Sequence, residues 1–357
     1  MPRTRGIFLC SLVIFLSALV VPAAARLHEI QFRRNDYVSV PAPSRLQGAG
    51  LSKAILRVFS DDEPRGGLYY GNGLFPVVRP ALDLWTREFS QASLPLWAWM
   101  GARKFAWLRD PQLLDREWLS GEPRPIAKLD LFNPQALGLI VRLFSQLARQ
   151  PVAGILIQDD LTLLRHEGFS NWGKASFSRT SGLAADPRRM LARGSAHHRA
   201  WEDIKAKRIG AALGEIVAAC REANPALTIG LNVHYEAPLN PAQARSWYAF
   251  DCQEANAAGI DLFYLMAYHR QMKAEMKLSE GDNRIRFRLM LEAALRLWGP
   301  RLAVKLQVRD WQTSELIPLE ELKTYYDLIP AGVGRVCFAA ADPDDIPLVA
   351  QIIGSIL

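Results

Sequence analysis

Two adjacent aspartates, Asp159 and Asp160, follow the apolar run "GILI" at residues 154–157, with Gln158 between the run and the pair. Burial at a strand end and a neighbouring negative charge both raise the pKa of a carboxyl group. A carboxyl group that keeps its proton near neutral pH can act as a general acid, and an ionised carboxylate can stabilise a positive centre. This is the chemistry of glycosidic bond cleavage. The alternative is a strand-end cap or an ion pair with Arg165.

Acids, bases and aromatic residues follow five other apolar runs in the same way. These are Asp61, Asp62 and Glu63; Met100, Arg103 and Lys104; His234, Tyr235 and Glu236; Tyr268 and His269; and Arg309, Asp310 and Trp311. Aromatic faces stack on sugar rings, and carboxylates hold hydroxyl or amino groups. The candidate substrate-binding residues are therefore Trp99, Glu236, Tyr268, Asp310 and Trp311. The sequence contains no "GxSxG" motif and no zinc signature, so we expect neither a metal nor a cofactor.

The elements that must position these residues form an alternating pattern. Short, nearly continuous apolar runs, typical of strands buried on both faces of a parallel sheet, occupy residues 53–62, 94–103, 152–160, 227–236, 260–269, 302–311 and 334–343. Helical periodicity occupies residues 134–150, 206–224, 240–259 and 283–299. The alternation predicts an α/β fold, specifically a TIM-like barrel with seven or eight strands. In such barrels the active site lies at the carboxyl ends of the strands.

An open, doubly wound parallel sheet is the alternative fold. Such sheets usually carry a glycine-rich phosphate-binding turn after an early strand, and the sequence has none.

The N-terminus has the pattern of a secretory signal. Arg3 and Arg5 precede the apolar run at residues 7–21, and small residues follow it up to residue 25. A membrane anchor is the alternative, but the run is shorter than the roughly 20 residues that span a bilayer. We predict a signal peptide at 1–25, an N-terminal extension at 26–50 and a barrel domain at 51–357. The mature protein would be exported, most simply to a periplasm, without stable membrane insertion.

The net charge and the cysteine content say less about function than the motifs do. The formal net charge is +7, and removal of Arg3 and Arg5 leaves +5. The basic stretch at 188–208 accompanies no nucleic-acid-binding motif, so we interpret it as a solvated loop and helix face, with contact to an anionic surface as the alternative. Cys220, Cys252 and Cys337 lack metal-ligand spacing. They are either three thiols or one disulfide and a thiol.

Several blocks of sequence resemble one family. "VAGILIQDDLTLL" resembles a strand that ends in His-Asp-Asp, "LPLWAWM" resembles "VYAWMPV", and "LDLFNPQALGLIVRLFSQLA" resembles a segment with "FDPQ" followed by a helix. Residues 231–268 resemble a region that ends in "MAMPY", "AVKLQVRDW" resembles "ELQAQNW", and "GVGRVCFAAADP" resembles a last strand with "GYYPDN". The family is that of the C-terminal glycoside hydrolase domain of PgaB, the periplasmic poly-β-1,6-N-acetylglucosamine processing protein of Gram-negative bacteria. The resemblance covers residues 52–353.

This resemblance implies a hydrolase of partially deacetylated poly-β-1,6-N-acetylglucosamine, with Asp159 and Asp160 as the catalytic pair. We assign Asp160 as the acid and Asp159 as the orienting or stabilising group. The nucleophile is then either a carboxylate or the substrate's own 2-acetamido group. The resemblance also implies an exopolysaccharide substrate and contact with export machinery. PgaB has an N-terminal metal-dependent deacetylase domain, which this chain lacks, so the resemblance implies no metal.

Two residue patterns depart from the family and leave other functions open. Gln158 stands where the family has His, and "MAYHRQM" replaces "MAMPY". The alternatives are a non-catalytic barrel that binds the polysaccharide and guides it to export, and a hydrolase of another amino-sugar polymer.

Overall fold

The structure, a computed structural model, describes residues 26–33, 40–60, 66–119 and 121–355. The proposed signal peptide and the strand-end acids Asp61, Asp62 and Glu63 lie outside the described residues. Within the described part of the chain, no helix is both long and apolar enough to cross a membrane.

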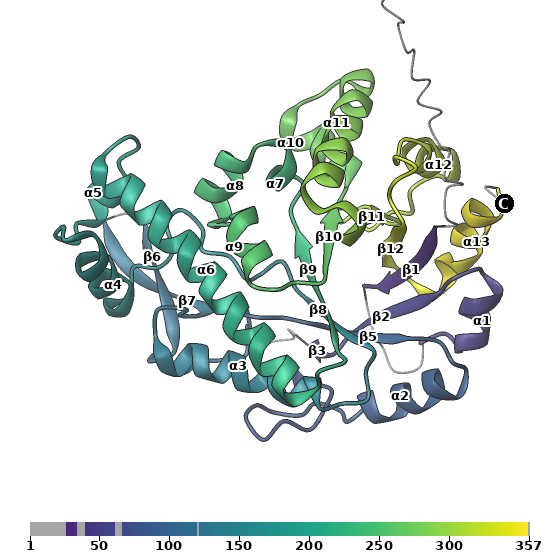
Figure 1. The fold of residues 1–357 in the computed structure, drawn as a ribbon, viewed down its shortest axis with the longest axis horizontal. Helices are drawn as coiled ribbons and strands as arrows, with labels where there is room; N and C mark the ends of the chain where they lie inside the picture. The colour runs from purple at the N-terminus through teal and green to yellow at the C-terminus, as the bar shows by residue number, and fades with distance from the viewer. Residues whose placement is uncertain (1–25, 34–39, 61–65, 120, 356–357) are drawn as a thin grey trace, which may run out of the picture.

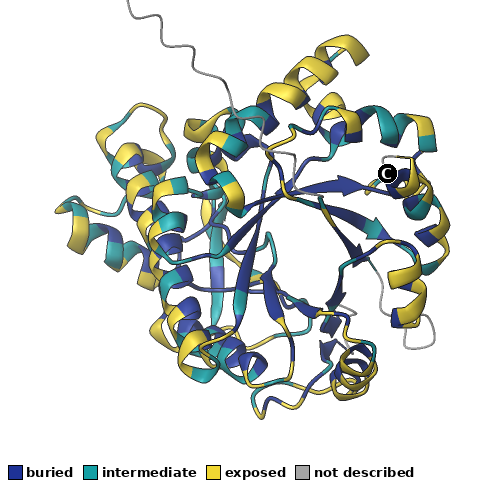
Figure 2. Cartoon of the chain, turned by 45° about the vertical axis from the view of Figure 1, so that its right-hand side comes forward, coloured by how far each residue is buried: buried dark blue, intermediate teal, exposed yellow. Residues whose placement is uncertain are grey.

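Eight parallel strands close into a barrel, surrounded by helices (Figure 1). Around the barrel the strands are β1 (Leu27–Phe32), β12 (Arg335–Ala341), β11 (Leu302–Gln307), β10 (Leu262–Met266), β9 (Thr228–Val233), β8 (Gly154–Ile157), β5 (Leu96–Met100) and β2 (Lys53–Arg57), which pairs with β1. Figure 2 shows that the ring of strands is buried while exposed residues lie on the outer helices. The predicted TIM-like α/β barrel is confirmed, with eight strands.

The eighth strand is the one that the sequence analysis did not identify. Strand β1 lies in residues 26–50, which we predicted to be an extension, so the barrel starts at residue 27 and not at residue 51. The reason is that β1 reads "LHEIQF", with polar residues at His28, Glu29 and Gln31, and therefore lacks a continuous apolar run. Its Glu29 is fully buried and binds Lys53 of β2 at 2.9 Å.

Most helices lie between consecutive strands and cover the outside of the barrel. They are α1 (Pro43–Gly48), α2 (Leu82–Gln91), α3 (Pro134–Ala148), α6 (Ala196–Ala223), α7 (Glu236–Leu239), α8 (Pro241–Tyr248), α9 (Cys252–Ala257), α10 (His269–Met276), α11 (Glu280–Trp298), α12 (Leu319–Asp327) and α13 (Ile346–Gly354), with short 3-10 turns at Gly299–Arg301 and Pro343–Asp345. Helix α3 begins as predicted, because Asn133 caps it by accepting a hydrogen bond from the Gln135 amide and Pro134 is its first residue.

Three segments are inserted between elements of the barrel. A short antiparallel pair, β3 (Phe59–Ser60) and β4 (Gly67–Leu68), follows β2. A hairpin of β6 (Leu114–Leu119) and β7 (Glu122–Leu129) follows β5, and α4 (Asn171–Ser181) and α5 (Pro187–Leu191) follow β8. The hairpin and the two helices lie together on the left of Figure 1, over a small core of their own that contains Phe169, Phe177, Met190, Trp201 and Ile204.

The basic stretch at 188–208 is only partly solvated. It covers most of α5 and the first half of α6. Lys205 is 1% exposed and donates to the Leu164 carbonyl at 2.9 Å, and Arg208 donates to the Leu131 carbonyl at 2.6 Å. These two cations therefore stabilise neighbouring loops instead of facing solvent.

The three cysteines after residue 25 are free thiols. Cys220 and Cys337 are buried and Cys252 is half-buried. Burial raises the pKa of the Cys220 and Cys337 thiols to about 12. Thiols that hold their protons so strongly are poor nucleophiles, which agrees with a structural role.

Candidate active site

Asp160 is held by the backbone of the loop after β5. Its carboxylate accepts hydrogen bonds from the amides of Ala102 at 2.9 Å, Arg103 at 2.7 Å and Lys104 at 2.6 Å. Burial raises the pKa of Asp160, and the three amide hydrogen bonds oppose that shift because they favour the ionised form. Asp160 therefore fixes one strand-end loop to another, and its oxygen atoms are already committed.

Asp159 has the opposite surroundings. It is half-buried, and no hydrogen bond or ion pair joins its carboxylate to any residue that the structure describes. Of the described acids that directly follow barrel strands, Asp160, Glu236, Asp310 and Asp342 all have such partners, so Asp159 is the carboxylate left open at the mouth of the barrel.

The charge of Asp159 acts on the pKa of two other groups, the Tyr268 phenol and the Lys305 ammonium. Burial raises the pKa of the Tyr268 phenol, and the Asp159 carboxylate raises it further. Burial lowers the pKa of Lys305, whereas Cys337 and Asp159 oppose that shift. The Lys305 ammonium, 1% exposed, donates to the Asn232 side-chain oxygen at 2.8 Å across the barrel interior. Asn232 also lines a small cavity together with Gln158, Asp159 and His234.

Several buried polar atoms near the mouth have no hydrogen-bond partner among the described residues. They are Oε1 of Gln31, Nε1 of Trp99, Oε1 of Gln158, and both amide atoms of Gln307. We call the set of Gln31, Trp99, Gln158, Asn232, Lys305 and Gln307 the mouth cluster. Buried polar groups are almost always satisfied in folded proteins, by protein, water or ligand. The mouth cluster therefore offers donors and acceptors to a polar ligand.

Strand register explains why the mouth cluster faces inward. Lys305 and Gln307 are two residues apart on β11, so both side chains point to the same face. Lys305 pairs with Cys337 and Gln307 pairs with Ala339 on β12. On the other side of β12, Glu29 of β1 also pairs with Cys337, and Gln31 is two residues further along β1. Gln31 and Gln307 thus flank the small Ala339.

Glu236 is more deeply buried than expected for a residue that contacts substrate. It is 3% exposed, and its Oε1 accepts a hydrogen bond from the Tyr248 hydroxyl at 2.9 Å while Oε2 has no partner among the described residues. Burial raises the pKa of this carboxyl group. The Tyr248 ring stacks on His234, with centroids 4.3 Å apart.

Of the other predicted residues, Trp99 lies inside the barrel, whereas Asp310 and Trp311 lie at its rim. Trp99 is half-buried inside the barrel, edge-on to Phe59. Asp310 caps a turn by accepting from the amides of Gln312 at 2.9 Å and Thr313 at 3.1 Å, and Trp311 is 51% exposed beside it. Asp159 follows β8 and Tyr268 follows β10, so both lie at the carboxyl ends of barrel strands, and Asp310 and Trp311 lie together in the loop after β11.

His269 is buried and not a surface residue. It is 2% exposed, its Nε2 contacts Glu321 at 2.8 Å, and its ring stacks on Tyr325 with centroids 3.9 Å apart.

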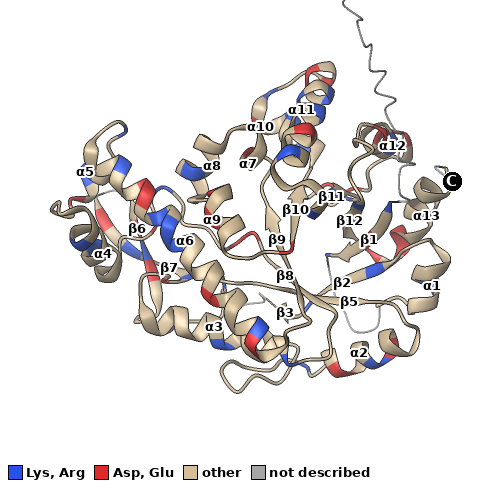
Figure 3. Ribbon diagram, in the orientation of Figure 1, with Lys and Arg blue, Asp and Glu red and all other residues tan. Residues whose placement is uncertain are grey.

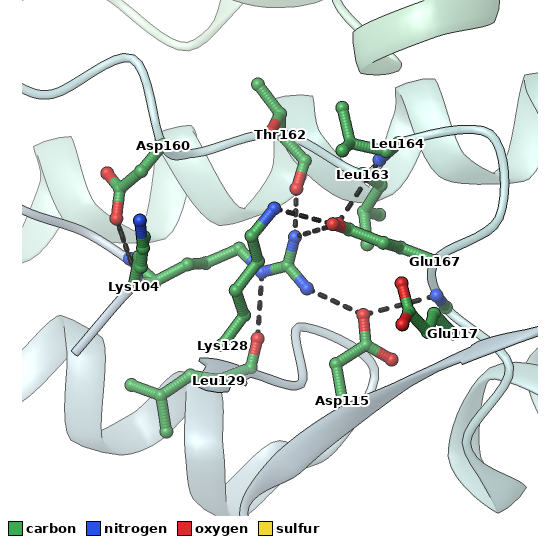
Figure 4. A network of polar contacts seen from close by, with 12 residues as sticks. Lys104, Asp115, Glu117, Lys128, Leu129, Asp160, Thr162, Leu163, Leu164 and Glu167 are labelled. Carbon is green, nitrogen blue, oxygen red and sulfur yellow. Dashed lines mark hydrogen bonds and ion pairs between the residues drawn. The ribbon is translucent and has the colours of Figure 1, made fainter. Parts of the chain in front are cut away.

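A buried ionic network supports the loop that holds Asp160 (Figure 4). The Arg103 guanidinium is fully buried and binds Asp115 at 2.6 Å and Glu167 at 2.8 Å, and it also donates to the carbonyls of Leu129 and Thr162. Lys128 binds the other oxygen of Glu167 at 2.5 Å. The network joins the β5 loop to the β6–β7 hairpin and to the segment after Asp160.

Outside this network, positively and negatively charged residues are mixed, and neither sign dominates one region of the outer helices. Lys, Arg, Asp and Glu are interspersed over the outer helices (Figure 3). Among the described residues, no group of three or more His, Cys, Asp or Glu side chains could hold a metal ion.

Five residues of the mouth cluster were not predicted as site residues: Gln31, Gln158, Asn232, Lys305 and Gln307. All but Gln158, which directly follows β8, lie within strands, where a polar residue carries no local signal that separates a ligand contact from a core hydrogen bond. Only the alternation of the strand and the closure of the barrel place them together.

Comparisons with known proteins agree with this geometry. The model of a family described as hypothetical glycosyl hydrolase family 13 matches residues 44–338. No curated protein matches the chain.

Among solved structures, the PgaB (BpsB) glycoside hydrolase domain from Bordetella bronchiseptica superimposes with a TM-score of 0.75 and 17% identity, covering 92% of this chain and 99% of that one. A β-galactosidase from the psychrophilic Marinomonas ef1 gives a TM-score of 0.67 and 11% identity, but the chain spans only 59% of its length. At such identities the likeness shows a shared fold. The resemblance to the PgaB domain, inferred from sequence blocks, is confirmed.

Proposed function

The chain belongs to hypothetical glycosyl hydrolase family 13, and from this premise we propose that it is an exported hydrolase of partially deacetylated poly-β-1,6-N-acetylglucosamine. The observation that carries the proposal is Asp159, an open carboxylate at the carboxyl ends of the barrel strands, the same end at which Tyr268 follows β10. This is where barrel enzymes hold their reacting groups. The polymer and the exported location follow from the sequence resemblance and the N-terminal pattern.

The geometry favours roles for Asp159 and Asp160 that are the reverse of those expected from the sequence. The carboxylate oxygens of Asp160 accept hydrogen bonds from three backbone amides, so we assign Asp160 as a positioning residue. Asp159 then protonates the leaving oxygen as the general acid. With no second open carboxylate among the described strand-end residues, the 2-acetamido group of the substrate serves as the nucleophile. Trp99 and Tyr268 contact the sugar, and Trp311 with Asp310 extends the binding surface at the rim.

The test is hydrolysis of the purified polymer by the mature protein. The products should be shorter oligosaccharides with new reducing ends, identified by mass spectrometry. Asp159→Asn should abolish their formation, whereas Asp327→Asn, a change at an exposed aspartate at the end of α12, should leave it unchanged. A panel of other amino-sugar polymers tests the substrate. Cleavage of one of those alone would reject poly-β-1,6-N-acetylglucosamine but keep the hydrolase.

A second function has one observation in its favour. The commitment of Asp160 to the backbone leaves Asp159 as the one open carboxylate among the described strand-end residues, and the Lys305 ammonium adds a cation to the barrel interior. A barrel that only binds the polymer and guides it to export would tolerate this arrangement. That function predicts tight polymer binding, no new reducing ends, and no effect of Asp159→Asn beyond a change in affinity.

A further inference from the structure

Lys305 changes the charge of the mouth in a way that bears on which sugar can enter it. Its side chain is 1% exposed, and its hydrogen bond to Asn232 joins two strands, β11 and β9, that are not neighbours in the barrel. Lys305 is two residues from Ala303 on β11 and therefore points to the same face, and Ala303 belongs to the buried cluster of Trp97 and Tyr264 inside the barrel. The ammonium therefore lies inside the barrel.

The donors of Lys305 are only partly used. An ammonium carries three N–H donors and no acceptor. Asn232 accepts from one of them, and no other hydrogen bond of Lys305 is found among the described residues. A carbonyl oxygen can accept from the others. A substrate ammonium cannot, because it also only donates, and its charge would be repelled in a site where water screens little.

Two neutral glutamine amides lie on the same part of the barrel interior as Lys305. Gln307, on the same face of β11, is fully buried with both amide atoms unpartnered among the described residues, and Gln31 lies beyond Ala339 at 3% exposure with its Oε1 unpartnered. Amides match the N–H and C=O of an acetamido group. Asn232, the hydrogen-bond partner of Lys305, lines the same small cavity as Asp159, so this cation lies near the one open carboxylate among the described strand-end acids. The described residues of the mouth therefore hold no surplus of negative charge that would attract a free amine.

We propose that Lys305 makes the mouth cluster selective for a 2-acetamido sugar and excludes a free 2-amino sugar from this position. The inference rests on the proposed function and deepens it, because it states which residues of a partially deacetylated polymer are placed at Asp159. Free amines of the polymer then lie outside the barrel interior.

The test measures binding, so that it does not depend on turnover. Hexamers of β-1,6-linked N-acetylglucosamine and of β-1,6-linked glucosamine are titrated calorimetrically into Asp159→Asn and into the double variant Asp159→Asn/Lys305→Met. We expect the acetylated hexamer to bind Asp159→Asn at least about tenfold more tightly, and the ratio to fall toward one in the double variant. Lys207→Met, at an exposed lysine of α6, is the matched control in the same background and should keep the ratio.

The possible outcomes distinguish the selectivity of Lys305 from the proposed hydrolase function. A ratio unaffected by Lys305→Met, or tighter binding of the glucosamine hexamer while Lys305 is present, would overturn the inference whatever the protein hydrolyses. Selective binding without any cleavage by the unaltered protein would reject the hydrolase and keep the selectivity. Failure of both hexamers to bind would reject both. A thermal unfolding scan checks that each variant is folded. Lys305→Gln, which retains a donor for Asn232, replaces the Met variant if that one unfolds.

Discussion

At the scale of single residues, two adjacent aspartates have different surroundings. Asp160 accepts three backbone hydrogen bonds, and Asp159 has no such partner among the described residues. Their order along the chain made a catalytic pair the natural prediction, because the sequence shows that both follow a buried strand. It cannot show which side chain turns back toward a neighbouring loop. That information depends on where the loop after β5 runs in three dimensions.

Asp160→Asn should lower stability and activity together. An amide keeps one acceptor but loses the charge that strengthens the hydrogen bonds from the β5 loop, and each bond to a charged group is worth about 1.5–3 kcal/mol. Urea unfolding should show a loss of that order. The rate should fall equally with the polymer and with an activated aryl glycoside, because poor positioning affects both. Recovery of the rate with the aryl glycoside would instead make Asp160 the proton donor.

Trp311→Ala should weaken oligosaccharide binding and leave stability nearly unchanged. The ring is 51% exposed, so its removal costs little burial. Stacking on aromatic side chains is worth about 1–3 kcal/mol per base in nucleic-acid complexes, which gives a scale for a sugar ring. The calorimetric affinity for a hexamer reports the effect. Trp172→Ala, a change at a 51% exposed Trp in α4, is the control, and equal losses in the two variants would contradict a role for Trp311.

At the scale of elements, the sequence predicted seven of the eight strands because those strands are apolar runs. It failed at β1, where Glu29 and Gln31 face the interior of the barrel. A buried acid is tolerated there because Lys53 and the Tyr264 hydroxyl bind its carboxylate at 2.9 Å and 2.7 Å. No local sequence pattern predicts these partners, because they are 24 and 235 residues away in the chain.

The Arg103 network should give stability a distinct pH dependence. Burial raises the pKa of the Asp115 carboxyl from 3.8 to about 7, although Arg103 opposes the shift. Between these values the folded protein holds a proton that the unfolded chain has released. The contribution of Asp115 to the free energy of unfolding therefore falls as the pH rises from about 4 to about 7, and it is constant above that range.

Asp115→Asn removes this titration. The stability of the variant relative to the unaltered protein should therefore rise steadily between about pH 4 and pH 7 and level off above it. Urea unfolding at several pH values measures the difference. A difference that does not vary with pH would show that Asp115 is ionised throughout and that Arg103 governs its charge.

At the scale of the whole molecule, the barrel closes around its site from eight segments spread between residues 27 and 341. The alternation of strands and helices was enough to predict that architecture, and with it the end of the barrel at which we propose the active site. The mouth cluster as a set was not predictable, because only Trp99 was named from the sequence and the members come from β1, β5, β9, β11 and the end of β8. The closure of the barrel is what brings them together.

Export is a prediction that concerns the whole chain. Processing after residue 25 would remove Arg3 and Arg5 and leave a net charge of +5 on the mature protein. N-terminal sequencing of protein recovered from the periplasm of an expressing Gram-negative cell should begin at Arg26. Protein that starts at Met1 and stays with the membrane fraction would contradict the signal.

The central claim is that Asp159 donates the proton that cleaves an amino-sugar polymer. The most direct measurement compares the unaltered protein with Asp159→Asn on two substrates: the polymer and an aryl N-acetylglucosaminide with a good leaving group. Loss of general acid help costs about 10²–10⁴ in rate. The account predicts a loss of that size on the polymer, with most of the rate retained on the aryl glycoside, whose leaving group needs little protonation. An Asp159→Asn variant that is folded and cleaves the polymer as fast as the unaltered protein would contradict it.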